Sequence, residues 1–216
     1  MQPNNQSLIN RVRARLTEKG IFKGNEIGTQ GYLALYQNTN GTFTSLSFDV
    51  IANTGTVRSI ERRLDNTDMF TITHWSMNIL KATTTSAADM SKARRYTYPN
   101  QAAFTNYANW YAAYNGYLQV IVDRTTLIDS FDTQRFFRAD FAEQGVNSYT
   151  NDTYSSQNYG YAELDPEVTL NGLGSNQITL NFPASTDLAT GGAAGDGVLL
   201  VCRGIRWQNA SKVNPS

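Results

Sequence analysis

The sequence has very few of the residues on which cysteine and metal chemistry depends. It contains one cysteine, Cys202, and one histidine, His74. A single cysteine excludes an intramolecular disulfide and a zinc site made of several cysteines, and a single histidine excludes sites that need two or three imidazole ligands. No Gly-x-Ser-x-Gly, Walker A, dinucleotide-binding or His-Glu-x-x-His motif is present. We therefore expect a non-enzymatic protein with no catalytic residue, no cofactor and no metal.

Charged residues and long apolar runs are also scarce. Asp, Glu, Lys and Arg make up 17% of the chain, against about 25% of an average soluble protein. The longest aliphatic run covers residues 198–202, far short of the roughly 20 residues that cross a bilayer. The first residues are polar and uncharged, so we expect neither a secretory signal peptide nor a transmembrane helix.

Polar uncharged residues and aromatic residues are abundant instead. The chain has 21 Asn, 24 Thr and 15 Ser among its 216 residues, and 12% of it is aromatic. Disordered chains are poor in aromatic residues, so this one can bury a core and fold. Thr and Tyr favour strands, whereas Asn and Gly favour turns. The composition therefore predicts a mainly β fold, and the length predicts one domain.

The net charge of zero hides a separation of charge along the chain. Residues 1–100 hold twelve Lys and Arg against seven Asp and Glu, while residues 101–216 hold six against eleven. Such a separation can hold copies of one chain together or present one face to a polyanion. The alternative interpretation is that loops scatter these charges over a neutral surface.

Residues 7–19 predict a basic amphipathic helix. Leu8, Val12 and Leu16 recur every four residues and form one apolar stripe. We assign residues 1–30 to this N-terminal helix or arm and residues 31–216 to a β-sandwich domain. The helix either packs on its own sandwich or contacts a neighbouring subunit, packaged nucleic acid or internal lipid. The candidate contact residues are Arg11, Arg13, Arg15 and Lys19.

From residue 31 onward the sequence predicts eight or nine short strands and one inserted helix. In segment 69–81 the apolar positions change parity on passing His74, which predicts a bulge there or a strand buried on both faces. The Asn- and Gly-rich residues 38–41 predict a hairpin. The strand count fits an antiparallel sandwich of the jelly-roll type rather than alternating strands and helices. The helix is expected at 101–114, and strands at 31–37, 42–52, 69–81, 117–124, 125–128, 134–139, 168–170, 177–182 and 197–207.

Carboxylates are the one group numerous enough to suggest catalysis, because two of them suffice for glycoside hydrolysis. Glu163, Asp165 and Glu167 would share one face of an extended strand, where they could also hold calcium. Pro166 interrupts the segment, so solvated acids near a turn are the alternative. The other candidate groups are Glu61, Asp65 and Asp68, and the pair Asp129 and Asp132.

Two segments combine basic and aromatic residues in a pattern typical of nucleic-acid binding. They are Arg94-Arg95-Tyr96 and the stretch from Arg135 to Arg138. Because the chain is neutral overall, a structural interpretation stays open beside the functional one. In that interpretation Arg135 and Arg138 form salt bridges with Asp132 or Asp140.

Five segments of the sequence resemble virion structural proteins, especially the small β-sandwich capsid proteins of tailless icosahedral bacteriophages. The resemblance starts at residue 61 and covers core and turn residues. The segments are ERRLDNTDMFTITHWSMNILKA (61–82), YTYPNQAAF (96–104), AAYNGYLQVIVDRTTLIDSFDTQRFFRADF (112–141), AELDPEVTLNG (162–172) and VLLVCRGIRWQN (198–209).

This resemblance implies a jelly-roll subunit that is made in the host cytoplasm and self-assembles, with other virion proteins, into an icosahedral capsid. Many capsid proteins of membrane-containing phages carry two stacked sandwiches in each chain, and this chain is short for that arrangement. We therefore expect a single jelly roll, with a minimal double jelly roll as the alternative. The short length also leaves open whether this is the major capsid protein or a minor vertex or spike protein.

A carbohydrate-binding β-sandwich is the main alternative of a different class. Exposed aromatic side chains would then stack on sugar rings. The candidates for such a platform are Trp110, Tyr149, Tyr154 and Tyr159.

Overall fold

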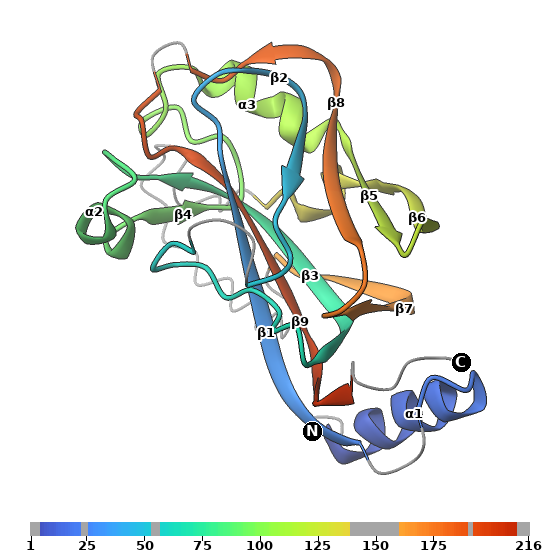
Figure 1. Ribbon diagram of the computed structural model, residues 1–216. Helices are drawn as coiled ribbons and strands as arrows, with labels where there is room; N and C mark the ends of the chain where they lie inside the picture. Colours follow the sequence, from blue (N-terminus) through green and yellow to red (C-terminus); the bar gives the residue numbers. More distant parts are fainter. Residues whose placement is uncertain (1–4, 23–25, 53–56, 139–159, 190–191, 211–216) are drawn as a thin grey trace, which may run out of the picture.

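The chain forms a β-sandwich of two antiparallel sheets (Figure 1). The computed structural model describes residues 5–22, 26–52, 57–138, 160–189 and 192–210. The first sheet contains β1 (Ile27–Asn38), β9 (Gly197–Gln208), β3 (Met69–Lys81), β4 (Arg94–Tyr96) and β7 (Ala162–Asn171). The second contains β2 (Thr42–Phe48), β8 (Asn176–Asp187), β5 (Tyr117–Val122) and β6 (Thr125–Asp132). The predicted mainly β sandwich is confirmed.

Strands that are distant in sequence lie beside one another in both sheets. In the first sheet β9 lies between β1 and β3, and β7 and the short β4 both pair with β3. In the second sheet the order is β2-β8-β5-β6. The described strands make one pair of sheets, whereas two stacked sandwiches would need two pairs.

The expected hairpin at residues 38–41 is wrong, because the chain crosses there from one sheet to the other. β1 pairs with β9, and β2 pairs with β8. The turn is held by the segment between β8 and β9 instead of by a two-strand ladder. Buried Thr39 donates from its amide and its hydroxyl to the carbonyl of Asp196, at 3.2 and 3.1 Å, and the carbonyl of Gly41 accepts from Leu188.

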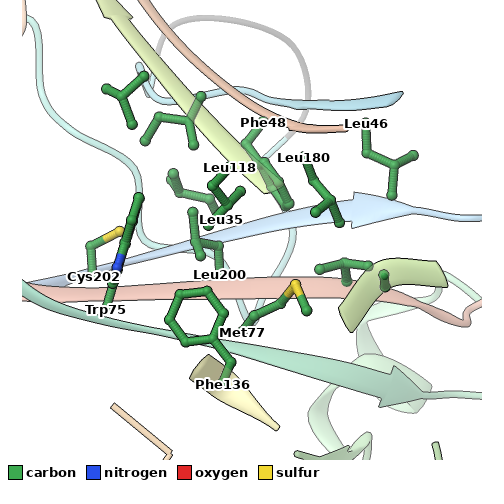
Figure 2. Packing of buried hydrophobic residues seen from close by; sticks show 14 of the residues in the cluster. Leu35, Leu46, Phe48, Trp75, Met77, Leu118, Phe136, Leu180, Leu200 and Cys202 are labelled. Carbon is green, nitrogen blue, oxygen red and sulfur yellow. The ribbon is translucent and has the colours of Figure 1, made fainter. Parts of the chain in front are cut away.

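The main core lies between the two sheets and includes fully buried Trp75. Figure 2 shows side chains from both sheets meeting there, among them Leu35, Leu200, Leu118 and Leu180. The pairing of β3 shifts register between Ile72 and His74, which confirms the predicted bulge. Nearly every residue of β3 is buried, so this strand is covered on both faces as well.

The outer face of the first sheet is therefore apolar at both ends. Helix α1 (Asn5–Glu18) covers the end where β1 begins and β9 ends (Figure 1). The opposite end holds a cluster that includes Leu80, Leu199 and Tyr36, and Met90 of the short helix α2 (Ala87–Ser91) packs on it. None of the helices in the described residues is long and apolar enough to cross a bilayer.

Several predicted boundaries differ from the structure: β2 is shorter than expected, and β6, β7 and β8 are longer. The inserted helix α3 spans only Tyr107–Tyr114, because Asn100 accepts from the amides of Ala102 and Ala103 and closes a separate turn first. The strand expected at 134–139 is wrong. Residues Thr133–Phe136 form the 3-10 helix η1, whose start is capped by the Asp132 carboxylate and which buries Phe136. Strand β1 begins at Ile27, four residues before the expected start of the sandwich domain.

Candidate functional site

The apolar stripe of α1 packs on the chain's own sandwich. Ile9, Val12 and Leu16 are buried against Ile205 and Trp207 on the outer face of the first sheet. The Trp207 indole also donates to the Thr71 hydroxyl at 2.9 Å. Burial of each large aliphatic side chain contributes about 1.5–3 kcal/mol. The helix is thus part of the folded domain, which is one of the two roles that the sequence left open.

Three of the four predicted contact residues hold this helix in place. The guanidinium of Arg11 lies 2.9 Å from one carboxylate oxygen of Glu167 on β7, and Arg15 pairs with the other oxygen. Arg13 donates to the Glu26 carbonyl at 3.0 Å, and its guanidinium carbon lies 6.0 Å from the centre of a Trp207 ring. Lys19 is exposed. The structure therefore divides these cations between two sides of the helix instead of gathering them on one outward face.

A shallow apolar groove runs beside the helix. It has a volume of about 370 Å³ and lies between α1, β7 and the turn that joins β5 to β6. Apolar groups from all three elements line it, including Leu16, Pro166 and Leu127. Leu127 is 46% exposed. This groove adds apolar surface at the edge of the second sheet, where β6 pairs only with β5 among the described strands.

A second groove, which we name the outer-face groove, crosses the first sheet beyond the N-terminal end of α1. Its volume is about 620 Å³, and Tyr32, His74, Arg95, Tyr161 and Arg203 line it. The pairing register puts Tyr32 of β1 beside Arg203 of β9, and Arg203 beside His74 of β3. Directly paired residues of neighbouring strands project to the same face, so these three side chains form a row across the sheet.

The cations of the outer-face groove lie over aromatic rings. The guanidinium carbon of Arg203 is 3.8 Å from the ring centre of Tyr161, and that of Arg62 is 5.1 Å from the ring centre of Tyr32. His74 contacts the Thr73 hydroxyl through Nδ1 at 3.1 Å. The sequence pattern indicated Arg95 as a candidate, but it assigned His74 a place in a strand and missed Tyr32, Tyr161 and Arg203.

Most of the candidate carboxylates have structural partners. The Glu61 side chain is buried and pairs with Arg63 at 2.9 Å. Asp68 pairs with Arg206 and accepts from the amide of Asn209. Asp65, Asp129 and Asp132 each accept hydrogen bonds from neighbouring groups. The predicted trio lies on β7, where Glu167 pairs with α1 while Glu163 and Asp165 are exposed. Within the described ranges, no three His, Cys, Asp or Glu residues are close enough together to hold a metal ion.

Burial makes the buried thiol and two phenols poor acids. It raises the pKa of Cys202 to about 12 and raises the pKa of Tyr114 above its usual value. Burial is also the main cause that raises the pKa of Tyr36, whose hydroxyl donates to the Gly195 carbonyl at 3.0 Å. A thiol that stays protonated is a weak nucleophile. Cys202 is accordingly a core residue.

One of the four sugar-binding candidates lies in the described residues, and it is not exposed. Trp110 is fully buried, and its indole donates to Asn106 at 3.2 Å. Tyr149, Tyr154 and Tyr159 lie outside the described residues. The large aromatic side chains that are exposed in the described ranges are Tyr32, Tyr111 and Tyr117.

The second basic and aromatic segment is structural in part. Arg135 lies over the Phe131 ring at 5.3 Å and not against Asp132, and Arg138 donates to the carbonyl of Phe137. The other expected partner, Asp140, lies outside the described residues. By contrast, Arg94 and Arg95 on β4 are both exposed.

Known proteins give no family for this chain. No family model matches the sequence, and no curated protein matches it. Function must therefore be inferred from the strand order, the surfaces and the charges described above.

Proposed function

We propose that the chain is a virion structural protein, most simply a capsid subunit that assembles with copies of itself into an icosahedral phage shell. We further propose that its sandwich is a single jelly roll. The observation that carries both statements is the order of the strands in the two sheets.

A jelly roll pairs eight strands from the outside of the sequence inward, first with last and second with seventh, until the fourth pairs with the fifth. Leaving aside the three-residue β4, the pairs here are β1 with β9, β2 with β8, β3 with β7 and β5 with β6. All four pairs are antiparallel. This nested pairing supports a jelly roll over other sandwiches with nine strands.

Fold alone does not specify function, because capsid, lectin and cupin domains share the jelly roll. A metal site made of several histidines is excluded by the single His74. In the carbohydrate-binding alternative, Trp110 is the sugar-stacking candidate that lies in the described residues, and it is buried. Shell assembly requires surfaces for neighbours, and the exposed apolar side chains of Ile27, Leu127 and Leu173 support it.

Exposed sheet edges also support assembly. The outer edge of β1 is bridged only by residue 62 in the described chain, and β6 ends the second sheet with six of its eight residues exposed. Such edges invite pairing with another chain. In a shell, these edges of one subunit contact several neighbouring subunits. An ordinary contact between two proteins buries about 800 Å² of surface on each partner.

Sedimentation velocity over a range of protein concentrations tests this function. We expect the purified chain to form large closed particles, with few intermediates, as the concentration rises. A small closed oligomer would favour the minor vertex or spike protein instead. A monomer that persists at the highest concentration would refute self-assembly.

A further inference from the structure

The outer-face groove is cationic and aromatic at once. Its lining includes Arg95, Arg203 and His74, and no Asp or Glu is among the lining residues. Arg62 adds a third arginine, placed over Tyr32. Exposed Glu163 of β7 pairs with His74 and continues the row at the edge of the groove, so three arginines face one described carboxylate here. Such an excess of cations raises the local positive potential and attracts polyanions.

In the described part of the chain, the arginines that line this groove form no ion pairs. Elsewhere in the described chain, Arg11, Arg15, Arg63, Arg206 and Lys81 all pair with carboxylates. Arg95 and Arg203 are exposed, and neither forms a salt bridge with a described carboxylate. Among the described residues, no carboxylate therefore occupies their guanidinium groups, which can pair with an anion from outside the chain.

The backbone brings these side chains together from five separate parts of the sequence. Tyr32, Arg203 and His74 form the row across β1, β9 and β3, while Arg95 comes from β4 and Tyr161 directly precedes β7. The paired Gly31 and Gly204 also line the groove, and Gln30 lines it on the side of α1. The groove is thus a property of the folded sheet and not of one basic segment.

We propose that the outer-face groove binds single-stranded nucleic acid. Arg95 and Arg203 contact phosphates, and an unpaired base stacks on the ring of Tyr32, which is 48% exposed. Stacking on aromatic rings beside a basic track is how proteins hold single strands without reading their sequence. The volume of about 620 Å³ lies within the usual range of about 300–1,000 Å³ for ligand pockets and suits one or two nucleotides.

An acidic polypeptide is the competing occupant, because it would also satisfy the arginines. The exposed Tyr32 ring, with Arg62 beside it, favours the nucleic acid. A carboxylate chain gains little from an aromatic face, whereas every base has a flat ring to place there. Nucleic-acid binding is separate from capsid assembly, because it is measured on the purified chain whether or not particles form.

Fluorescence anisotropy with a labelled oligothymidylate of about 20 nucleotides tests the arginines. The double variant Arg95→Gln/Arg203→Gln should bind at least about tenfold more weakly than the unmodified chain. The slope of log affinity against log salt should fall in magnitude by about 1.4, because each lost phosphate contact on a single strand removes about 0.7. The matched control Arg94→Gln/Arg124→Gln removes two exposed arginines that do not line the groove. It should change the affinity by less than about threefold.

Two single variants then test the stacking. Tyr32→Ala should weaken oligothymidylate binding by about 5- to 100-fold, whereas Tyr32→Phe should keep it within about twofold. Failure of the oligonucleotide to bind would overturn the proposal, and so would equal losses in the two double variants. Competition by polyglutamate as strong as that by the oligonucleotide would also overturn it and would assign the groove to an acidic polypeptide.

Discussion

Two neighbouring regions of the outer face of the first sheet, the end under α1 and the outer-face groove, use basic side chains in opposite ways. Under α1, Arg11 and Arg15 pair with a single carboxylate, that of Glu167. In the outer-face groove, Arg203 lies over a tyrosine ring and forms no described ion pair. In the first arrangement a carboxylate neutralises the positive charge within the fold, and in the second the positive charge stays exposed. Basic residues that are close in sequence are therefore a poor guide to a binding surface. Basic residues that the pairing of strands brings side by side are a better guide.

The largest expected effect separates an aromatic ring that stabilises the fold from one that binds. Trp207→Ala should lower the free energy of unfolding by about 3–5 kcal/mol, because it removes a fully buried indole between α1 and the sheet. Tyr32→Ala in the groove should lower it by less than about 1 kcal/mol. Urea unfolding of both variants measures the difference. Equal losses of stability would remove the contrast between the end under α1 and the outer-face groove.

Two paired glycines in the groove floor give the next largest contrast. A Cβ atom at Gly204 would overlap the backbone oxygen of Thr71, whereas one at Gly31 would lie 3.6 Å from the nearest atom, the Cβ of Arg206. We expect Gly204→Ala to destabilise the protein by about 1–3 kcal/mol. Gly31→Ala should change stability by less than about 1 kcal/mol. Thermal unfolding compares them, and a tolerated Gly204→Ala would show that β3 and β9 approach less closely than described.

The carboxylate under α1 should contribute less than these packing contacts. Glu167→Gln removes the partner of two arginines whose side chains are 60% and 42% exposed, so solvent screening limits the loss to about 1–2 kcal/mol. Glu163→Gln on the same strand is the control and should stay within about 0.5 kcal/mol. Chemical denaturation at low and high salt measures both, and the loss for Glu167→Gln should shrink as salt rises. A loss that does not depend on salt would contradict the ion-pair interpretation.

The smallest expected effect concerns the basic residues of the helix. Arg11→Gln/Arg15→Gln should lower the free energy of unfolding by less than about 1 kcal/mol for each residue. It should leave oligothymidylate affinity within about twofold, because these arginines lie on Glu167 and not in the groove. Anisotropy titration is the measurement. A loss of affinity as large as that of the groove variant would return the binding role to the N-terminal helix.

Local patterns in the sequence were sufficient to predict the main elements. The apolar repeat of Leu8, Val12 and Leu16 predicted α1, and the parity change at His74 predicted the bulge in β3. These signals depend on neighbours within one turn or a few strand residues. The predicted limits of β3, residues 69–81, match the structure.

Features that depend on long-range pairing could not be predicted in this way. The turn at residues 38–41 has hairpin residues, yet its bonds to Asp196 direct the chain into the other sheet. The partner of Arg11 and Arg15 lies more than 150 residues away, at Glu167. The outer-face groove likewise requires the register of β1, β9 and β3, which no local pattern contains. Only Arg95 carried a local signal, through the basic and aromatic residues beside it.

Electron microscopy of the purified full-length chain at high protein concentration tests the shell proposal most directly. We expect closed isometric particles in which the sandwich repeats with its sheet edges against neighbours. A field of separate, well-folded monomers under conditions in which the helix remains packed on the sheet would contradict it.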